Sequence, residues 1–247
     1  MINSDGIMEH MRQESYRPLS YAELTAVLGI SEEEENKFNK VLGRLEKEGE
    51  IVKTRKNKYG LPDMMNLIKG TIRLNQRGYG ILVPDDLKYP EIFVYSGGLN
   101  GAMHSDKVMV RLSAGHNGGQ RPEGEVIRVI KRANQQLVGT FERGKKQSQV
   151  IPDDNRHFYP VYVRPVRKMA VKDGDKVVVN ITAWPGKDRA LEGRIVEVLG
   201  HKGEPGLDLQ VVIKKHGLRT EFPEAVLEEA SEAARPLSDE ELSRRRD

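Results

Sequence analysis

The sequence of 247 residues contains no cysteine, so it can form no disulfide bond and offers no thiolate ligand to a metal ion. No apolar run approaches the roughly 20 residues that span a bilayer. The first residues, MINSDGIMEHMRQES, are polar and lack the apolar stretch of a signal peptide. We therefore expect a soluble protein of the reducing cytoplasm.

Recognisable catalytic motifs are also missing. The sequence has no phosphate-binding loop and no serine in a nucleophile-elbow context, and its six histidines show no ligand spacing. The adjacent carboxylates Asp85-Asp86 and Asp153-Asp154 each follow a proline at the end of an expected strand, which is typical of a turn. We expect neither catalytic residues nor a metal site in this chain.

Charge is distributed unevenly along the sequence. Residues 1–50 carry six Lys and Arg against eleven Asp and Glu, whereas residues 51–70 carry five against one. Residues 71–200 carry twenty-one against fourteen, and residues 201–247 carry eight against eleven. A basic centre between acidic ends suggests a polyanion as partner, although scattered solvated lysines would give the same totals.

A chain of this length is expected to form two or three domains, and the first spans residues 1–69. Ser20 has the position of a helix cap before YAELTAVLG, and Ser31 and Glu34 have capping-box spacing at the start of a second helix that ends near Gly49. Two extended segments then flank the turn-forming stretch NKYG. Helix-turn-helix plus hairpin predicts a winged helix.

The predicted second helix begins with the four glutamates Glu32 to Glu35, which phosphates would repel. This favours a packing or RNA-proximal module over a sequence-specific DNA reader. The predicted hairpin, or wing, is basic and could contact a nucleic-acid backbone, although such residues are also ordinary on a solvated turn. Its candidate contacts are Lys53, Arg55, Lys56 and Lys58.

Residues 70–200 contain a diverged internal repeat with matching anchors. Gly-Thr, Pro-Asp-Asp, Asp-Lys-Val and a Gly-led strand occur in the same order in both copies, at intervals of 14, 22 and 18 residues and then 13, 23 and 18. Each copy holds about five short alternating or β-branched segments, which in so small a unit predict a five-stranded barrel of the OB type. We therefore place one barrel at residues 70–134 and a second at residues 135–200.

Helical periodicity returns in residues 201–247. The segments LDLQVVIKKHG and PEAVLEEASEAARP predict two helices, and a capped third helix is expected from Ser238. The fold class is thus mainly β with α: a winged helix, two tandem five-stranded OB-type barrels and a short helical C-terminal segment.

The stretch RGYGILV and the later EIFVYS carry the strongest candidate binding site. Residues two apart in a strand share a face, so Tyr79, Phe93 and Tyr95 are expected on one surface, with the glycines at 78 and 80 leaving the rings unobstructed. Bases stack on such rings. The alternative is that Phe93 belongs to the core and the glycines serve barrel curvature. Backbone contacts are expected from Arg73, Arg77 and Lys88.

The second copy lacks most of this surface. Alignment on the anchors places Gln147 and Gln149 opposite Tyr79 and Ile81, and places Tyr162 and Arg164 opposite Phe93 and Tyr95. The second barrel is therefore predicted to contact backbone more than bases, or to be a spacer with a basic face. Its candidate contacts are Lys145, Lys146, Arg164, Arg167 and Lys168.

RGYGIL and EIFVYS resemble the two nucleic-acid motifs of cold-shock domains, although Ile81 and Ser96 stand where that family often places further aromatic residues. The order of parts, from YGLPDMMNLIKGTI through VVVNITAWP and LEGRIVEVLG to TEFPEAVLEEA, resembles the N-terminal region of bacterial ribonuclease R over nearly the whole chain. The resemblance implies a hydrolytic 3′-to-5′ exoribonuclease whose cold-shock domains feed RNA to a magnesium-dependent nuclease domain and an S1 domain.

The sequence ends before the aspartate cluster of that nuclease domain. We therefore expect a chain that binds single-stranded RNA as a monomer, needs no cofactor itself and does not cut RNA alone, with Mg²⁺ implied for the absent nuclease domain. Two alternatives stay open. One is a free-standing regulator that uses its winged helix on DNA, and the other is an RNA chaperone complete as it stands.

Overall fold

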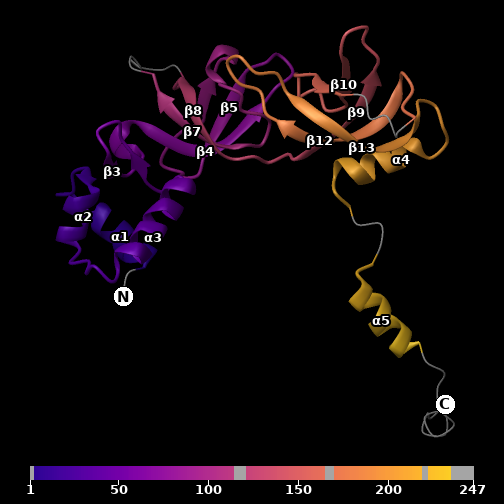
Figure 1. Cartoon of the computed structure of the whole chain (residues 1–247). Coiled ribbons are helices and arrows are strands. Elements are labelled where there is room, and N and C mark those ends of the chain that lie inside the picture. Colours follow the sequence, from indigo (N-terminus) through magenta and orange to yellow (C-terminus); the bar gives the residue numbers. More distant parts are fainter. Residues whose placement is uncertain (1–2, 114–120, 165–169, 219–221, 235–247) are drawn as a thin grey trace, which may run out of the picture. The chain divides into compact units, whose positions relative to one another are not determined.

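The computed structural model of the chain describes residues 3–113, 121–164, 170–218 and 222–234 (Figure 1). The chain divides into two compact units, Met1–Lys202 and Gly203–Asp247. The first unit contains a helical N-terminal module and two five-stranded sheets, and the second contains two helices. In the described residues no helix is long and apolar enough to cross a membrane.

The N-terminal module (residues 3–60) combines three helices with a small sheet. Its helices are α1 (Ser4–Met11), α2 (Tyr21–Val27) and α3 (Glu35–Lys47), and its strands are β1 (Leu19–Ser20), β2 (Val52–Lys53) and β3 (Lys58–Gly60). The strand order is β1-β3-β2. Helices and sheet share one core, which includes Met11, Leu24, Phe38, Leu42, Leu45 and Ile51.

The start of α2 is as predicted, and the start of α3 is not. Ser20 and Glu23 form a reciprocal capping box, with the Glu23 N–H donating to Ser20 Oγ at 3.3 Å and the Ser20 N–H donating to Glu23 Oε2 at 2.6 Å. Ser31 does not cap α3, because its hydroxyl donates to the Glu34 carboxylate instead. Helix α3 therefore begins at Glu35, and three of the four glutamates lie in the turn before it.

The hairpin is present, but its turn lies earlier than predicted. Thr54 to Asn57 make the turn, with Asn57 in the left-handed region at φ 57°, and Lys58-Tyr59-Gly60 form strand β3. Asn tolerates this backbone conformation better than other residues with a side chain. Strand β1 also pairs with β3, and neither β1 nor α1 was predicted from the sequence.

A 3₁₀ helix, η1 (Asp63–Met65), leads from the N-terminal module into the first repeat copy. The strands of that copy are β4 (Leu67–Leu74), β5 (Gly80–Pro84), β6 (Ile92–Val94), β7 (Lys107–Leu112) and β8 (Gly124–Lys131), in the order β6-β5-β4-β7-β8, with a 3₁₀ helix η2 (Ser96–Gly98) after β6. A parallel bridge between Phe93 and Glu123 joins the two edges. We call this sheet the first barrel.

The second barrel repeats this strand order as a fully closed sheet. Its strands are β9 (Gln136–Glu142), β10 (Ser148–Pro152), β11 (Val161–Val163), β12 (Asp175–Ala183) and β13 (Glu192–His201), in the cyclic order β10-β11-β13-β12-β9. The parallel β11–β13 pair makes the closure that the single bridge makes in the first barrel. Two five-stranded barrels of the OB type are therefore confirmed.

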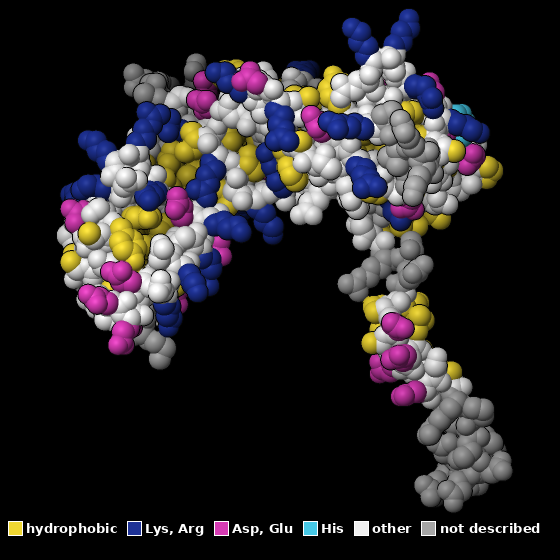
Figure 2. Space-filling model, in the orientation of Figure 1, with side chains coloured by type: hydrophobic (Ala, Val, Ile, Leu, Met, Phe, Trp, Pro, Cys, Tyr) yellow, Lys and Arg dark blue, Asp and Glu magenta, His cyan; other side chains and the backbone are white. Residues whose placement is uncertain are grey.

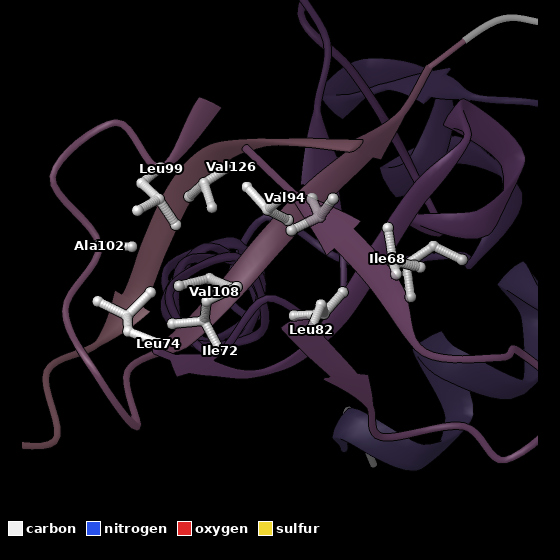
Figure 3. Close-up of a cluster of buried hydrophobic side chains, with 11 residues drawn as sticks. Ile68, Ile72, Leu74, Leu82, Val94, Leu99, Ala102, Val108 and Val126 are labelled. Carbon is white, nitrogen blue, oxygen red and sulfur yellow. The ribbon is translucent and has the colours of Figure 1, made fainter. Parts of the chain in front are cut away.

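Alternating side chains of the strands fill each barrel. Figure 3 shows the interior of the first barrel, where Ile72, Leu82, Val94, Val108 and Val126 converge from different strands. The second barrel is filled in the same way by residues that include Val150, Val161, Val163, Val177, Val179 and Ile195. Period-2 burial of this kind fixes which side chains are left on the outer surface.

The repeat anchors have the same structural role in both barrels. Lys176 Nζ lies 2.5 Å from Asp153 Oδ1 and 2.9 Å from Thr140 Oγ1. In the first barrel Lys107 makes the corresponding contacts with Asp85 and Thr71. The second aspartate of each pair accepts a backbone N–H bond in the turn. Asp86 accepts from Lys88 at 3.0 Å, and Asp154 accepts from Arg156 at 3.1 Å. The prediction that both aspartate pairs are structural is confirmed.

The anchor glycine Gly70 is required by close strand packing, which gives a stability prediction. A Cβ at this buried position would lie 2.3 Å from the carbonyl oxygen of Val83. Gly70→Ala should therefore lower the free energy of unfolding in urea by roughly 1–3 kcal/mol, the usual cost of overpacking. Gly43→Ala is the control, because no atom lies within 4 Å of its Cβ position on α3. Equal stability of the two variants would contradict the explanation.

An ion pair between the partly buried Arg132 and the buried Asp106 lies at the joint between the two barrels. Arg132 donates to Asp106 Oδ2 at 2.8 Å and to the Gly101 carbonyl at 2.7 Å, and its guanidinium lies 5.5 Å from the ring centre of Trp184. Met103 of the first barrel packs into the core of the second, and Phe158 of the second packs against the core of the first. Burial raises the pKa of the Asp106 carboxyl, against the opposing effect of its three donors.

The N-terminal module contacts one end of the outer face of the first barrel. Arg128 on β8 donates to the Glu46 carbonyl of α3, and Lys69 on β4 pairs with Glu50 at 2.5 Å. Gly49 fits against Ile130, where a Cβ would lie 2.6 Å from the Ile130 Cδ1 atom. These contacts bury Met109, an outward residue of β7, and leave the other end of the face accessible.

The second unit confirms two predicted helices, α4 (Leu207–Lys215) and α5 (Glu224–Ala233). Gly217 follows α4 in the left-handed region at φ 60°, as expected of a helix stop. Asp and Glu side chains line α5 in Figure 2. The helix predicted from Ser238 lies outside the described residues.

Candidate nucleic-acid interface

Three aromatic rings form a continuous row on the outer surface of the first barrel. The ring centres of Tyr79 and Phe93 lie 4.8 Å apart at 35°, and those of Phe93 and Tyr95 lie 4.8 Å apart at 75°. Tyr95 is 57% exposed, and the other two rings are half-buried. The prediction that these residues share one face is therefore confirmed, and we call them the aromatic row.

Strand register explains the position of the row. Ile81 on β5 pairs with Phe93 on β6 and with Arg73 on β4, so these three side chains share a face across three strands. Tyr79 precedes Ile81 by two residues and Tyr95 follows Phe93 by two, so both rings extend the same face.

The two glycines beside Tyr79 have structural roles, which corrects the interpretation that they leave the rings unobstructed. Gly78 adopts φ 82° in the turn, where Asn75 Oδ1 accepts N–H bonds from Arg77 at 3.0 Å and Tyr79 at 3.1 Å. Gly80 is buried, and a Cβ there would lie 2.8 Å from the Ile72 Cδ1 atom. The glycines thus serve the turn and the core, while the row occupies the outer face.

A carboxylate that was not predicted lies beside the row. Glu123, just before β8, accepts a hydrogen bond from the Tyr95 hydroxyl at 2.9 Å and forms the backbone bridge with Phe93. This hydrogen bond raises the pKa of the Tyr95 hydroxyl. One sequence signal could have revealed it, because Glu123 and Glu192 each stand before the Gly-led strand in their copies.

Of the predicted backbone contacts in the first barrel, the structure brings two to the row. Arg73 and Arg77 are exposed beside it, and within the described residues neither guanidinium pairs with a carboxylate. Lys88 lies beyond the opposite end of β5, where its ammonium contacts Asp86 at 2.9 Å and Asp63 at 3.3 Å. These hydrogen bonds raise the pKa of Lys88. Lys88 is therefore separated from the row and already paired.

The predicted wing residues belong to the N-terminal module and are only partly available. Lys58 pairs with Glu23 at 3.6 Å, and the Lys53 ammonium lies 5.4 Å from the ring centre of Tyr59. Arg55 and Lys56 are exposed in the turn of the hairpin. The wing is thus a separate basic surface from the aromatic row.

Helix α3 carries a further basic stripe that was not recognised in the sequence. Four exposed residues at intervals of three or four share one face, opposite the buried Phe38, Leu42 and Leu45: Lys37, Lys40, Arg44 and Lys47. In the sequence, Glu32 to Glu35 suggested a helix start that repels phosphates, so the basic spacing of the later residues was missed. Figure 2 shows Lys and Arg side chains over the N-terminal module, with Asp and Glu side chains elsewhere on it.

The second barrel has the predicted strand register, but its outer face carries fewer groups suited to binding nucleic acid. Gln149 pairs with Tyr162, which confirms their alignment with Ile81 and Phe93. Glu142 occupies the place of Arg73 and accepts a hydrogen bond from Gln149 at 2.9 Å. The predicted contacts Lys145, Lys146 and Arg164 are exposed, whereas Arg167 and Lys168 lie outside the described residues.

The described residues offer a surface for stacking and ion pairing. No group of three or more His, Asp or Glu side chains suited to a metal ion occurs among them. An aromatic row flanked by exposed arginines on an OB-type barrel is the usual platform for a single-stranded nucleic acid. Fold and surface together define a tandem OB-fold protein of the cold-shock type.

Comparisons with known proteins agree with this class. The Ribonuclease B OB domain model matches residues 70–129, and the Cold shock domain model matches residues 150–223. Ribonuclease R of Thermotoga maritima is 31% identical over 250 residues, covering 100% of this chain and 34% of the relative. Ribonuclease R of Acidithiobacillus ferrooxidans is 26% identical over 233 residues, covering 94% of this chain and 53% of the relative.

Solved structures show the same fold. The apo form of Mycoplasma genitalium RNase R matches with a TM-score of 0.61 and 18% identity, covering 72% of this chain and 28% of that chain. The yeast pseudonuclease Ssd1 matches with a TM-score of 0.52 and 18% identity, covering 62% of this chain and 25% of the Ssd1 chain. The resemblance to the N-terminal region of bacterial ribonuclease R is thereby confirmed. The chain spans about half of the Acidithiobacillus relative and about a third of the Thermotoga relative.

Proposed function

We propose that this chain binds single-stranded RNA as the N-terminal region of a ribonuclease R-type 3′-to-5′ exoribonuclease. The aromatic row, with Arg73 and Arg77 beside it, is the observation that carries the proposal. Bases stack on such rings with about 1–3 kcal/mol each, and every base has a face that can stack. The similarity to Mycoplasma genitalium RNase R, of which a complex with ribose methylated single-stranded RNA is known, supports the choice of ligand.

The two barrels contribute differently in this proposal. The first barrel stacks bases, and the second contacts phosphates through the exposed Lys145, Lys146 and Arg164. Glu142 in the place of Arg73 makes the second surface less basic at its centre than the first. A strand that crosses both barrels would pass from stacking contacts to ionic contacts on its way to a nuclease domain elsewhere in the polypeptide.

Binding without cleavage is the direct test. The chain should bind a fluorescent single-stranded RNA, and the logarithm of its affinity should fall linearly with the logarithm of salt concentration. The RNA should stay intact in the presence of Mg²⁺, because the proposal assigns the catalytic aspartates to a nuclease domain outside residues 1–247. Failure to bind at low salt, or shortening of the RNA, would overturn the proposal.

The helices and hairpin of the N-terminal module have the order of a winged helix, and we propose that they form a second, sequence-independent contact to nucleic acid. The basic stripe on α3 and the exposed Arg55 and Lys56 support this contact. A stripe of long cationic side chains suits phosphates rather than base edges. The rival function, a regulator that uses this module on a DNA duplex, is favoured by the same stripe.

Substitutions on α3 discriminate the two functions. In the full chain, Lys37→Ser, Lys40→Ser and Lys47→Ser together remove charge from an exposed face without touching the core. We expect affinity for single-stranded RNA to fall by no more than about tenfold, because the stripe adds ionic contacts while the row supplies the stacking energy. The rival function requires tight duplex-DNA binding that disappears in this variant. A gel-shift titration with both ligands measures the difference.

A further inference from the structure

The carboxylate of Glu123 has no evident role in phosphate binding or in barrel closure. A carboxylate is only a hydrogen-bond acceptor and repels phosphates. The closing contacts are made by backbone, since the Phe93 N–H donates to the Pro122 carbonyl at 2.7 Å and the Tyr162 N–H donates to the Leu191 carbonyl at 2.8 Å. Neither phosphate binding nor barrel closure therefore accounts for the Glu123 side chain, and its role is sought on the surface where it lies.

That surface is the aromatic row. Glu123 is half-buried, and its backbone is fixed opposite Phe93 by the bridge that joins the two edges of the sheet. The Tyr95 hydroxyl donates a hydrogen bond to Glu123 Oε1 at 2.9 Å. In the part of the chain that the structure describes, no Lys or Arg pairs with the Glu123 carboxylate. A base stacked on the row would have an anionic acceptor at its edge.

The second barrel repeats the same placement. Glu192 pairs with Tyr162 in the parallel β11–β13 ladder, as Glu123 bridges to Phe93. Arg164 stands in the place of Tyr95. The carboxylate thus recurs beside the central ring position although the two neighbouring aromatic residues do not.

A carboxylate at a base edge discriminates between bases. Cytosine presents an amino donor at N4, and a carboxylate accepts from it, whereas uracil presents the acceptor O4 at the same place. Both are pyrimidines of similar size, so their difference at this site is one of hydrogen bonding and charge.

We propose that Glu123 is a specificity-determining residue of the first barrel, which favours a base with an exocyclic amino group over uracil on the aromatic row. The inference rests on the proposed RNA binding and adds a base preference to it. Arg73 and Arg77 hold the strand by its phosphates, and Glu123 selects the base.

The test compares labelled C₁₀ and U₁₀ RNA on the full chain at fixed salt. We expect C₁₀ to bind about fivefold more tightly or better, the lower end of the discrimination that one such contact supplies. In Glu123→Gln the preference should fall below about twofold, because an amide offers both donor and acceptor to either base. Thermal unfolding of the variant should match that of the parent, because the substitution is isosteric.

Glu125→Gln is the matched control. Glu125 is the second residue of β8, is exposed and accepts a hydrogen bond from Asn100 at 2.8 Å, so its substitution removes the same charge but leaves the acceptor beside Tyr95 in place. Loss of a negative charge should strengthen binding of U₁₀ somewhat in both variants, but only Glu123→Gln should change the C₁₀-to-U₁₀ ratio. Equal binding of C₁₀ and U₁₀ by the parent, or an unchanged ratio in Glu123→Gln, would overturn the inference. Absence of binding to either RNA would instead overturn the proposed function.

Discussion

Replacing Tyr79 and Phe93 together with alanine is expected to weaken binding of single-stranded RNA by at least about thirtyfold, because each base stack contributes about 1–3 kcal/mol. The two rings lie 4.8 Å apart on the outer face, and neither belongs to the buried core of the first barrel. The fold should therefore survive the change. Fluorescence anisotropy with a labelled RNA measures the affinity, and circular dichroism checks the fold.

Tyr162→Ala is the control for this double substitution. Tyr162 holds the position of Phe93 in the second barrel, but Gln147 and Arg164 stand where Phe93 has the rings of Tyr79 and Tyr95. Its loss should change affinity by much less. The salt dependence gives a second readout, because the rings carry no charge and their removal should leave the slope unchanged, whereas Arg73→Ser should reduce it by roughly 0.7. Undiminished affinity of the double variant would show that the row is not the binding platform.

Asp106→Ala is expected to cost about 3–5 kcal/mol of unfolding free energy, because removing one partner of a buried ion pair leaves the other charge without compensation. Asp106 is 1% exposed and accepts hydrogen bonds from Arg132 and from the N–H groups of Met103 and Ala133. The N–H groups of Met103 and Ala133 would lose their acceptor, and Arg132 would keep only the Gly101 carbonyl. Urea unfolding followed by circular dichroism measures the loss.

Asp85→Ala provides the comparison for the joint. Asp85 also pairs with a cation, Lys107, but on an exposed turn where a salt bridge contributes about 0–1 kcal/mol. The two substitutions delete the same group, so the difference between them reports the burial of Asp106 together with its bonds to the Met103 and Ala133 N–H groups. A loss below about 1 kcal/mol in Asp106→Ala would mean that the joint contributes little to stability.

Much of the aromatic row was predictable because its determinants are local. Alternation along β5 and β6 is a property of the strands themselves, and it places Tyr79, Phe93 and Tyr95 on one face wherever the barrel closes. The repeat anchors aligned Gln149 with Ile81 and Tyr162 with Phe93, and the two pairs have the same register in their barrels. Local pattern failed at α3, because Ser31 can bond either the helix backbone or Glu34, and sequence spacing does not decide between them.

Strand periodicity and turn chemistry act over a few residues, so they suffice to predict the two five-stranded barrels, their common register, the structural use of the aspartate pairs and the aromatic row. Which charges lie beside the row depends on contacts between distant segments of the chain. Glu123 lies beside the row because the two edges of the sheet meet at its bridge with Phe93. Lys88 lies away from the row, where it pairs with Asp63. Such contacts join residues some 25 to 30 positions apart. Their partners are chosen by the packing of whole elements, which no short stretch of sequence specifies.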